Sequence, residues 1–74
     1  MNHIEFLRTP VDSAVLSSIG YSSDTTLELE FRSGATYRYF AVPPTVVQGL
    51  VEAESKGTFL NRNVRNHFRY QRLL

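Results

Sequence analysis

The chain has 74 residues and no cysteine, so it forms one small domain without disulfide bridges, thiol catalysis or thiolate metal sites. Its two histidines, His3 and His67, form no cluster with the carboxylates, and the sequence therefore predicts no metal and no cofactor. The net charge of +1 conceals a separation: residues 1–55 carry three basic and all seven acidic residues, whereas residues 56–74 carry five basic residues and no acid. Positive charge gathered in this way indicates an anionic partner, although an ordinary solvated helix face has the same composition.

The first residues carry no recognisable targeting signal. Residues 1–12 are expected to form an irregular lead-in, with Ile4, Phe6 and Leu7 docking on a single domain over residues 13–74. The lead-in lacks the basic start and the long apolar run of a signal peptide. No stretch approaches the roughly 20 apolar residues that span a bilayer. We therefore expect a cytoplasmic protein without membrane contact.

The first half of the chain predicts three antiparallel strands joined by short turns, a meander. In the first strand, within residues 13–23, one side is made by residues at every second position: Val15, Ser17, Ile19 and Tyr21. Gly20 in this strand indicates a bulge or a close approach of another backbone. Asp24 in the following turn is expected to hydrogen-bond the backbone just after it.

The second strand, residues 26–32, has the clearest pattern in the chain. Leu27, Leu29 and Phe31 share one face, and the charged residues between them share the other. This alternation is typical of an antiparallel sheet that is packed on one side and wet on the other. A Ser-Gly hairpin turn then leads to a third strand, residues 35–42.

Two helices are expected after the proline pair that ends the third strand. The first begins at Thr45, and Gly49 within it weakens the helix but allows close packing. Gly57 is expected to end this helix in the left-handed conformation. The second helix begins at Thr58, and the last residues form an extended tail. The apolar positions of the two helices are Val46, Val47, Leu50, Val51 and Ala53 in the first and Leu60, Val64 and Phe68 in the second. The order is β-β-β-α-α, an α+β fold with both helices on one sheet face.

Tyr37 and Tyr39 lie on one side of the third strand, and Arg38, Phe40 and Val42 lie on the other. If Phe40 and Val42 form the core, the tyrosines lie on the open face of the sheet beside the glutamates of the second strand. If the tyrosines form the core, Phe40 is the anomaly, a large apolar residue on the other side of the strand near its end. Tyrosines often fill small cores, but exposed tyrosines beside arginines also form platforms on which the bases of single-stranded nucleic acid stack. The pattern leaves both interpretations open.

The arginines of the last 13 residues are spaced by three or four positions, so a continuing helix would present them on one face. In a nucleic-acid-binding protein they would meet phosphates while the tyrosines stack on bases. The binding residues that this hypothesis predicts are Tyr37, Arg38, Tyr39, Arg62, Arg65, Arg69, Tyr70 and Arg72.

Catalysis is not expected. A nuclease built on His67 with Arg65 and Arg69 is a remote alternative, because it lacks a second acid or base. No P-loop, dinucleotide-binding, zinc-protease or EF-hand motif occurs in the chain.

Several short motifs follow one another in a specific order: "IGY", "LELEF", a turn glycine, "YRY", "VP", an A-x-S-x-G segment that begins at Ala53, and "TFLNRNVRNHF". From about Ser13 to Leu73 this order resembles the KTSC domain, which occurs at the C-terminus of some lysyl-tRNA synthetases and as a small stand-alone bacterial protein. The resemblance implies a module of unsettled function for which RNA binding has been suggested. It maps the Y-x-Y motif of the family to Tyr37 and Tyr39, and it implies no aminoacylation activity for this chain, which has no synthetase portion.

Two hypotheses about function follow. The first is a module that binds RNA or single-stranded nucleic acid, favoured by the basic end of the chain, the tyrosine pair and the family context. A pI of 8.2 and the acids of the second strand speak against it. The alternative is a protein-interaction or oligomerisation module that uses the half-bare sheet or the edge of the first or third strand.

Overall fold

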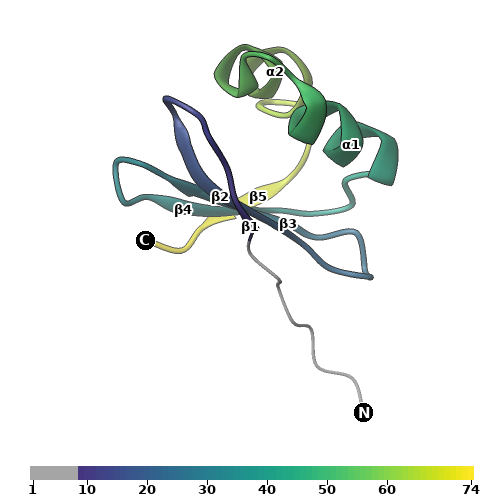
Figure 1. The fold of residues 1–74 in the computed structure, drawn as a ribbon. Coiled ribbons are helices and arrows are strands. Elements are labelled where there is room, and N and C mark those ends of the chain that lie inside the picture. Colours follow the sequence, from purple (N-terminus) through teal and green to yellow (C-terminus); the bar gives the residue numbers. More distant parts are fainter. Residues whose placement is uncertain (1–8) are drawn as a thin grey trace.

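The structure is a computed structural model, and it describes residues 9–74. Five antiparallel strands form one sheet whose spatial order follows the chain, and two helices lie together over one of its faces (Figure 1). The strands are β1 (Thr9–Pro10), β2 (Leu16–Tyr21), β3 (Leu27–Phe31), β4 (Thr36–Tyr39) and β5 (Tyr70–Arg72). The helices are α1 (Pro44–Glu52) and α2 (Lys56–Asn63), and both lie between β4 and β5 in the chain.

The expected α+β class is confirmed, but the three-stranded meander is incomplete, since β1 and β5 add a strand at each edge. β1 lies within the expected irregular lead-in, and it has only two residues, too few to show any alternation. β5 has three exposed residues and is held by backbone pairing with β4, so it needs no apolar pattern of its own. The expected docking of Ile4, Phe6 and Leu7 lies outside the described residues.

The expected alternation of β2 is wrong at its start. The register shifts between Leu16, which pairs with Phe31, and Ser18, which pairs with Glu30. A bulge at this point turns Leu16 into the core, whereas Val15 is 39% exposed. The bulge lies at Leu16–Ser18 and not at Gly20. From Ile19 onward the predicted alternation holds.

The core lies between the sheet and the helices. It contains residues from every long element: Leu16, Ile19, Leu27, Leu29, Tyr39, Val42, Val47, Leu50, Leu60 and Val64. Asp24 accepts a hydrogen bond from the Thr26 amide at 3.2 Å, as expected for the turn between β2 and β3. The hairpin between β3 and β4 turns at Gly34, whose φ of +97° favours glycine.

β4 is shorter than predicted, because the chain leaves the sheet after Tyr39. Ala41 adopts a φ of +57°, which redirects the backbone toward α1. The amide of Val42 then donates to the Thr25 carbonyl at 2.8 Å, and its side chain is fully buried. Val42 therefore belongs to the core although it lies beyond the end of β4, and its burial does not follow from the alternation of side chains along that strand.

The boundary between the helices also differs from the prediction. α1 has Pro44 in its first turn and ends at Glu52, and Ser55 caps α2 by accepting from the Thr58 amide at 3.2 Å. Gly57 is therefore not a left-handed stop, since it lies inside α2. The choice of glycine at position 57 is explained by packing, because a Cβ atom there would lie 3.0 Å from Cγ2 of Val15.

Candidate functional site

Tyr37 and Tyr39 lie on the face of the sheet that the helices cover. Tyr39 pairs with Leu27, and Tyr37 pairs with Leu29, so their side chains share the face of those two leucines. Tyr39 is only 4% exposed, whereas Tyr37 is half-buried. The first alternative for this strand, in which the tyrosines lie on the open face, is therefore wrong.

Arg38 lies on the opposite face of the sheet from the two tyrosines. Its Nη2 is 2.8 Å from Oε2 of Glu28, the residue with which it pairs across β3 and β4. The Glu28 carboxylate is 2% exposed, and Glu30 on the same face accepts a hydrogen bond from Ser18 at 3.0 Å. The sheet thus separates Arg38 from the tyrosines, and it also separates the glutamates of β3 from them. The acids do not oppose an anion on the tyrosine face.

Four aromatic rings form one cluster at the end of this face that the helices leave uncovered. The aromatic cluster consists of Phe31, Tyr37, Tyr39 and Tyr70. The ring of Tyr70 lies 5.6 Å from Tyr37 and 5.7 Å from Tyr39, measured between centroids. Tyr37 and Tyr39 are nearly parallel at 6.3 Å, and Phe31 meets Tyr37 edge-on at 5.6 Å. Tyr70 is 59% exposed, so the cluster has a buried end and a solvent-facing end.

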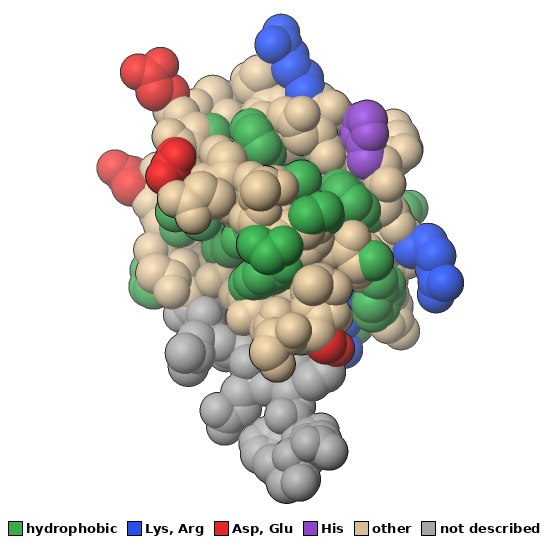
Figure 2. Space-filling view, turned by 90° about the vertical axis from the view of Figure 1, so that its right-hand side faces the viewer, with side chains coloured by type: hydrophobic (Ala, Val, Ile, Leu, Met, Phe, Trp, Pro, Cys, Tyr) green, Lys and Arg blue, Asp and Glu red, His purple; other side chains and the backbone are tan. Residues whose placement is uncertain are grey.

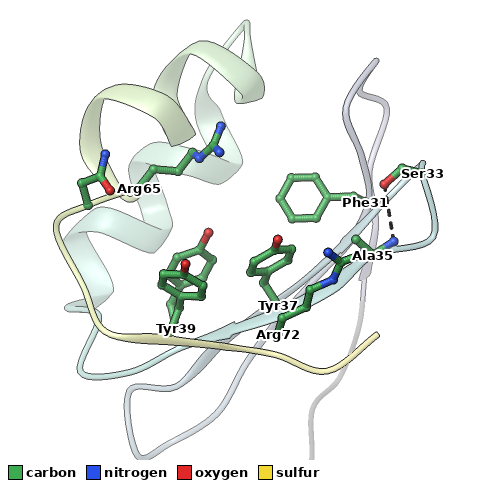
Figure 3. Close-up of a pocket in the computed structure, with 9 residues that line it drawn as sticks. Phe31, Ser33, Ala35, Tyr37, Tyr39, Arg65 and Arg72 are labelled. Carbon is green, nitrogen blue, oxygen red and sulfur yellow. Dashed lines mark hydrogen bonds between the residues drawn. The ribbon is translucent and has the colours of Figure 1, made fainter.

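The cluster forms the floor and wall of a pocket of about 380 Å³ (Figure 3). This aromatic pocket is lined by Phe31, Ser33, Ala35, Tyr37, Tyr39, Arg65, Asn66, Tyr70 and Arg72. In Figure 3 the hydroxyl groups of Tyr37 and Tyr39 point away from the sheet into the pocket. Arg65 reaches over it from the segment after α2, and Arg72 lies beside Tyr37.

The two arginines of the aromatic pocket differ in their hydrogen-bond partners. Arg65 donates to Oδ1 of Asn61 at 3.0 Å, and Arg72 donates through Nε to the main-chain oxygen of Leu74 at 2.8 Å. The guanidinium of Arg72 also lies 5.8 Å from the ring centroid of Tyr37, a cation–π distance. Within residues 9–74 neither arginine contacts an aspartate or glutamate side chain, and no acid lines the pocket. Arg65 therefore brings a positive charge that no acidic side chain of residues 9–74 contacts, whereas Arg72 is bonded to an oxygen of Leu74, the last residue of the chain.

The structure brings five of the eight predicted site residues together: Tyr37, Tyr39, Arg65, Tyr70 and Arg72. Arg38 lies on the other face of the sheet, and Arg62 and Arg69 are exposed but do not line the pocket. The Arg69 guanidinium lies 5.9 Å from the ring centroid of Phe40 instead. The residues of the remote nuclease alternative are also separated, because Arg65 lines the pocket and His67 and Arg69 do not.

Four residues that line the aromatic pocket were not among the predicted site residues: Phe31, Ser33, Ala35 and Asn66. Phe31 shares a face with Leu27 and Leu29, and this pattern indicated only a core position. Asn66 has a φ of +67°, which turns the chain after α2 toward β5. No sequence signal placed it beside the tyrosines.

Burial raises the pKa of the Tyr39 hydroxyl above its usual range, because the interior disfavours the phenolate. The positive charge of Arg65 acts in the opposite direction on the same group, which indicates that Arg65 and Tyr39 are electrostatically coupled across the pocket. Tyr39 therefore presents a protonated hydroxyl at neutral pH, able to donate or to accept a hydrogen bond.

Other kinds of site have no support in the part of the chain that the structure describes. Over residues 9–74 no three histidine or acidic side chains come close enough to hold a metal ion. Neither α1 nor α2 has the length and apolar character of a membrane-spanning helix.

The sequence pattern of the KTSC domain family matches residues 12–68, which is more than three quarters of the chain. This chain belongs to the KTSC domain family. The crystal structure of a KTSC domain protein from Yersinia pestis has the same fold, with a TM-score of 0.89 and 34% identity over 95% of this chain and 100% of that one. The KTSC resemblance seen in the sequence is confirmed.

Relatives of this KTSC domain are of two kinds. An uncharacterized protein from Stutzerimonas stutzeri is 48% identical over 68 residues, which cover 89% of this chain and 96% of that protein. A lysine–tRNA ligase from Nostoc punctiforme is 38% identical over 63 residues, which cover 84% of this chain but only 11% of the ligase. The KTSC domain is thus found both as nearly a whole small protein and as a minor part of a much larger enzyme.

Proposed function

We propose that this KTSC domain is a non-catalytic module that binds RNA, or single-stranded nucleic acid more generally, at the aromatic pocket. The observation that carries the proposal is the meeting of two arginines and a partly exposed tyrosine ring in one pocket, where neither arginine contacts an aspartate or glutamate side chain of residues 9–74. Arginine guanidinium groups match the geometry of phosphate, and aromatic rings stack on bases of any sequence.

The distribution of charge supports an anionic ligand on this side of the domain. The acids of β3 face the opposite side of the sheet, where Arg38 pairs with Glu28. On the side of α1, which Figure 2 shows, red acidic side chains project mostly at the upper left, and blue basic ones project at the top and the right; the acids and bases of that face are thus also apart. A low overall net charge is therefore compatible with a locally positive surface.

The family context supports RNA over DNA. Lysine–tRNA ligases that contain a related segment act, by their name, on a tRNA. A small module attached to such an enzyme would be useful as an additional RNA contact. In this proposal the module supplies binding only, and the ligase activity belongs to the rest of those larger proteins.

The test is a titration of labelled single-stranded RNA at low and moderate salt, followed by fluorescence anisotropy. Arg65→Gln should weaken binding by about tenfold, because it removes a charged hydrogen-bond donor from the pocket. Arg62→Gln is the matched control, since it removes the same charge three residues away, outside the pocket. The control should bind nearly as well as the wild type.

Tyr70→Ala tests the stacking contribution in the same titration. An aromatic ring on a base contributes roughly 1–3 kcal/mol, so we expect a loss of about tenfold or more. Circular dichroism of each variant establishes that it is folded. Absence of RNA binding by the wild type at low salt, or equal loss in Arg62→Gln and Arg65→Gln, would refute the proposal.

A second candidate function is association through an edge strand. The predicted edges, the first and third strands of the meander, are wrong, because β1 covers β2 and β5 covers β4. β5 is now one edge, and all three of its residues are exposed. Pairing of β5 with a strand of a partner or of a second copy would extend the sheet. Light scattering during size-exclusion chromatography tests self-association, and pull-down after nuclease treatment tests for a protein partner.

A further inference from the structure

We infer that the aromatic pocket holds a single nucleotide, with its base against the exposed tyrosine ring and its phosphate at Arg65 and Arg72. The inference rests on the proposed function and narrows it. The domain would recognise one unstacked or terminal nucleotide of a strand and would not follow a run of stacked bases.

The spacing of the tyrosine rings argues against a site for several bases. Tyr37 and Tyr39 are nearly parallel with their centroids 6.3 Å apart. A base inserted between two rings needs about 7 Å, twice the roughly 3.5 Å of a carbon–carbon contact. Tyr70 packs against both rings at 5.6 and 5.7 Å. The three rings therefore form one continuous wall, and a base can lie only on its outer side.

The dimensions of the aromatic pocket fit one small ligand. Its volume of about 380 Å³ lies near the lower end of the range for small-molecule sites, which is about 300–1,000 Å³. The hairpin after β3 limits the pocket on one side, through Ser33 and Ala35, and Arg65 limits it on the other (Figure 3). A nucleic-acid strand could continue beyond the pocket. The pocket, however, is lined by no aromatic ring other than those of the aromatic cluster, so it offers no separate stacking site for a second base.

The charges of the pocket are sufficient for one phosphate group. Arg65 approaches from the segment after α2, and Arg72 approaches from β5 (Figure 3). A guanidinium has five N–H donors, so Arg72, whose Nε is bonded to Leu74, and Arg65, whose Nη1 is bonded to Asn61, each have further donors for the oxygens of a phosphate. The remaining arginines of the C-terminal part, Arg62 and Arg69, do not line the pocket and supply no track for further phosphates.

Polar groups around the aromatic pocket offer contacts to the sugar and the edge of the base. The hydroxyls of Tyr37 and Tyr39 point into the pocket (Figure 3), and Asn66 also lines it. Hydroxyl groups can donate and accept, and an amide presents both functions at once. A nucleotide has a flat ring, a sugar with hydroxyl groups and an anionic group, and the pocket has a complement for each.

The experiment is an NMR titration of the full chain with a length series of one base type: inorganic phosphate, the nucleoside, the nucleoside monophosphate, and RNA of two, four and eight nucleotides. We expect the monophosphate to bind within about fivefold of the eight-nucleotide RNA, because one nucleotide makes most of the contacts. The nucleoside and inorganic phosphate should each bind at least about tenfold more weakly than the monophosphate. Amide shifts should concentrate on Arg65, Asn66 and residues 70–72.

Each outcome of this series is informative. Affinity that rises steeply from two to eight nucleotides, with no binding of the monophosphate, would overturn the single-nucleotide inference and leave RNA binding intact. Absence of binding at every length would overturn both proposals. Inorganic phosphate that binds as well as the monophosphate would show that the rings do not contribute. In the expected case Arg72→Gln weakens the monophosphate and the long RNA by the same factor, whereas Arg69→Gln weakens neither.

Discussion

Gly49 in α1 packs against the ring of Phe59 in α2, so closely that a side chain at position 49 would meet this ring. A Cβ atom at this position would lie 2.7 Å from Cζ and 2.8 Å from Cε2 of Phe59. Close packing at Gly49 could be predicted from the sequence, because glycine inside a helix needs a compensating reason. The partner could not be predicted, since it depends on how the two helices meet.

Gly49→Ala should therefore destabilise the domain by about 1–3 kcal/mol through overpacking, despite the better helix propensity of alanine. Urea denaturation followed by circular dichroism measures the change. In a Phe59→Leu background, which removes the ring that the new methyl group would strike, the same substitution should be neutral or stabilising. An equal loss in both backgrounds would contradict this explanation.

Pairing of β4 with β5 places Tyr39 opposite Tyr70, yet the two tyrosines have different surroundings. Tyr39 is part of the core, whereas most of Tyr70 is exposed. We expect Tyr39→Ala to cost about 3–5 kcal/mol of unfolding free energy and Tyr70→Ala less than about 1 kcal/mol. Thermal or urea denaturation of the two variants measures both values. Similar losses at the two positions would contradict the difference in burial between the two side chains.

The strands also show where the sequence was a sufficient guide and where it was not. The alternation of Leu27, Leu29 and Phe31 predicted β3 and its buried face, because a half-buried strand needs a period of two. The bulge at Leu16–Ser18 breaks that period and could not be located from β2 alone, since it depends on the partner strand. β5 has no buried side chain, so only its backbone pairing reveals it.

For the whole molecule, the sequence predicted one site made of the tyrosines, Arg38 and the four C-terminal arginines, and the structure divides that set into residues that line the aromatic pocket and residues that do not. Arg65 and Arg72 reach the aromatic cluster, because the chain turns at Asn66 after α2 and then returns along β4. Arg38 follows the pleat of β4 to the opposite face. The position of a residue relative to a turn or a pleat decided its group, and the spacing of the arginines along the chain carried no such information.

The most direct test of the proposed interface is the salt dependence of RNA affinity in two variants that lose the same charge. For single-stranded nucleic acid, each neutralised phosphate contributes about −0.7 to the slope of log K against log salt concentration. Arg72→Gln removes one of the two guanidinium groups at the phosphate of the aromatic pocket, so its slope should be shallower than that of the wild type, by at most about 0.7. Arg69→Gln removes one that lies over Phe40, outside the pocket, and its slope should parallel that of the wild type. Equal slopes for the two variants would contradict the assignment of RNA binding to the aromatic pocket.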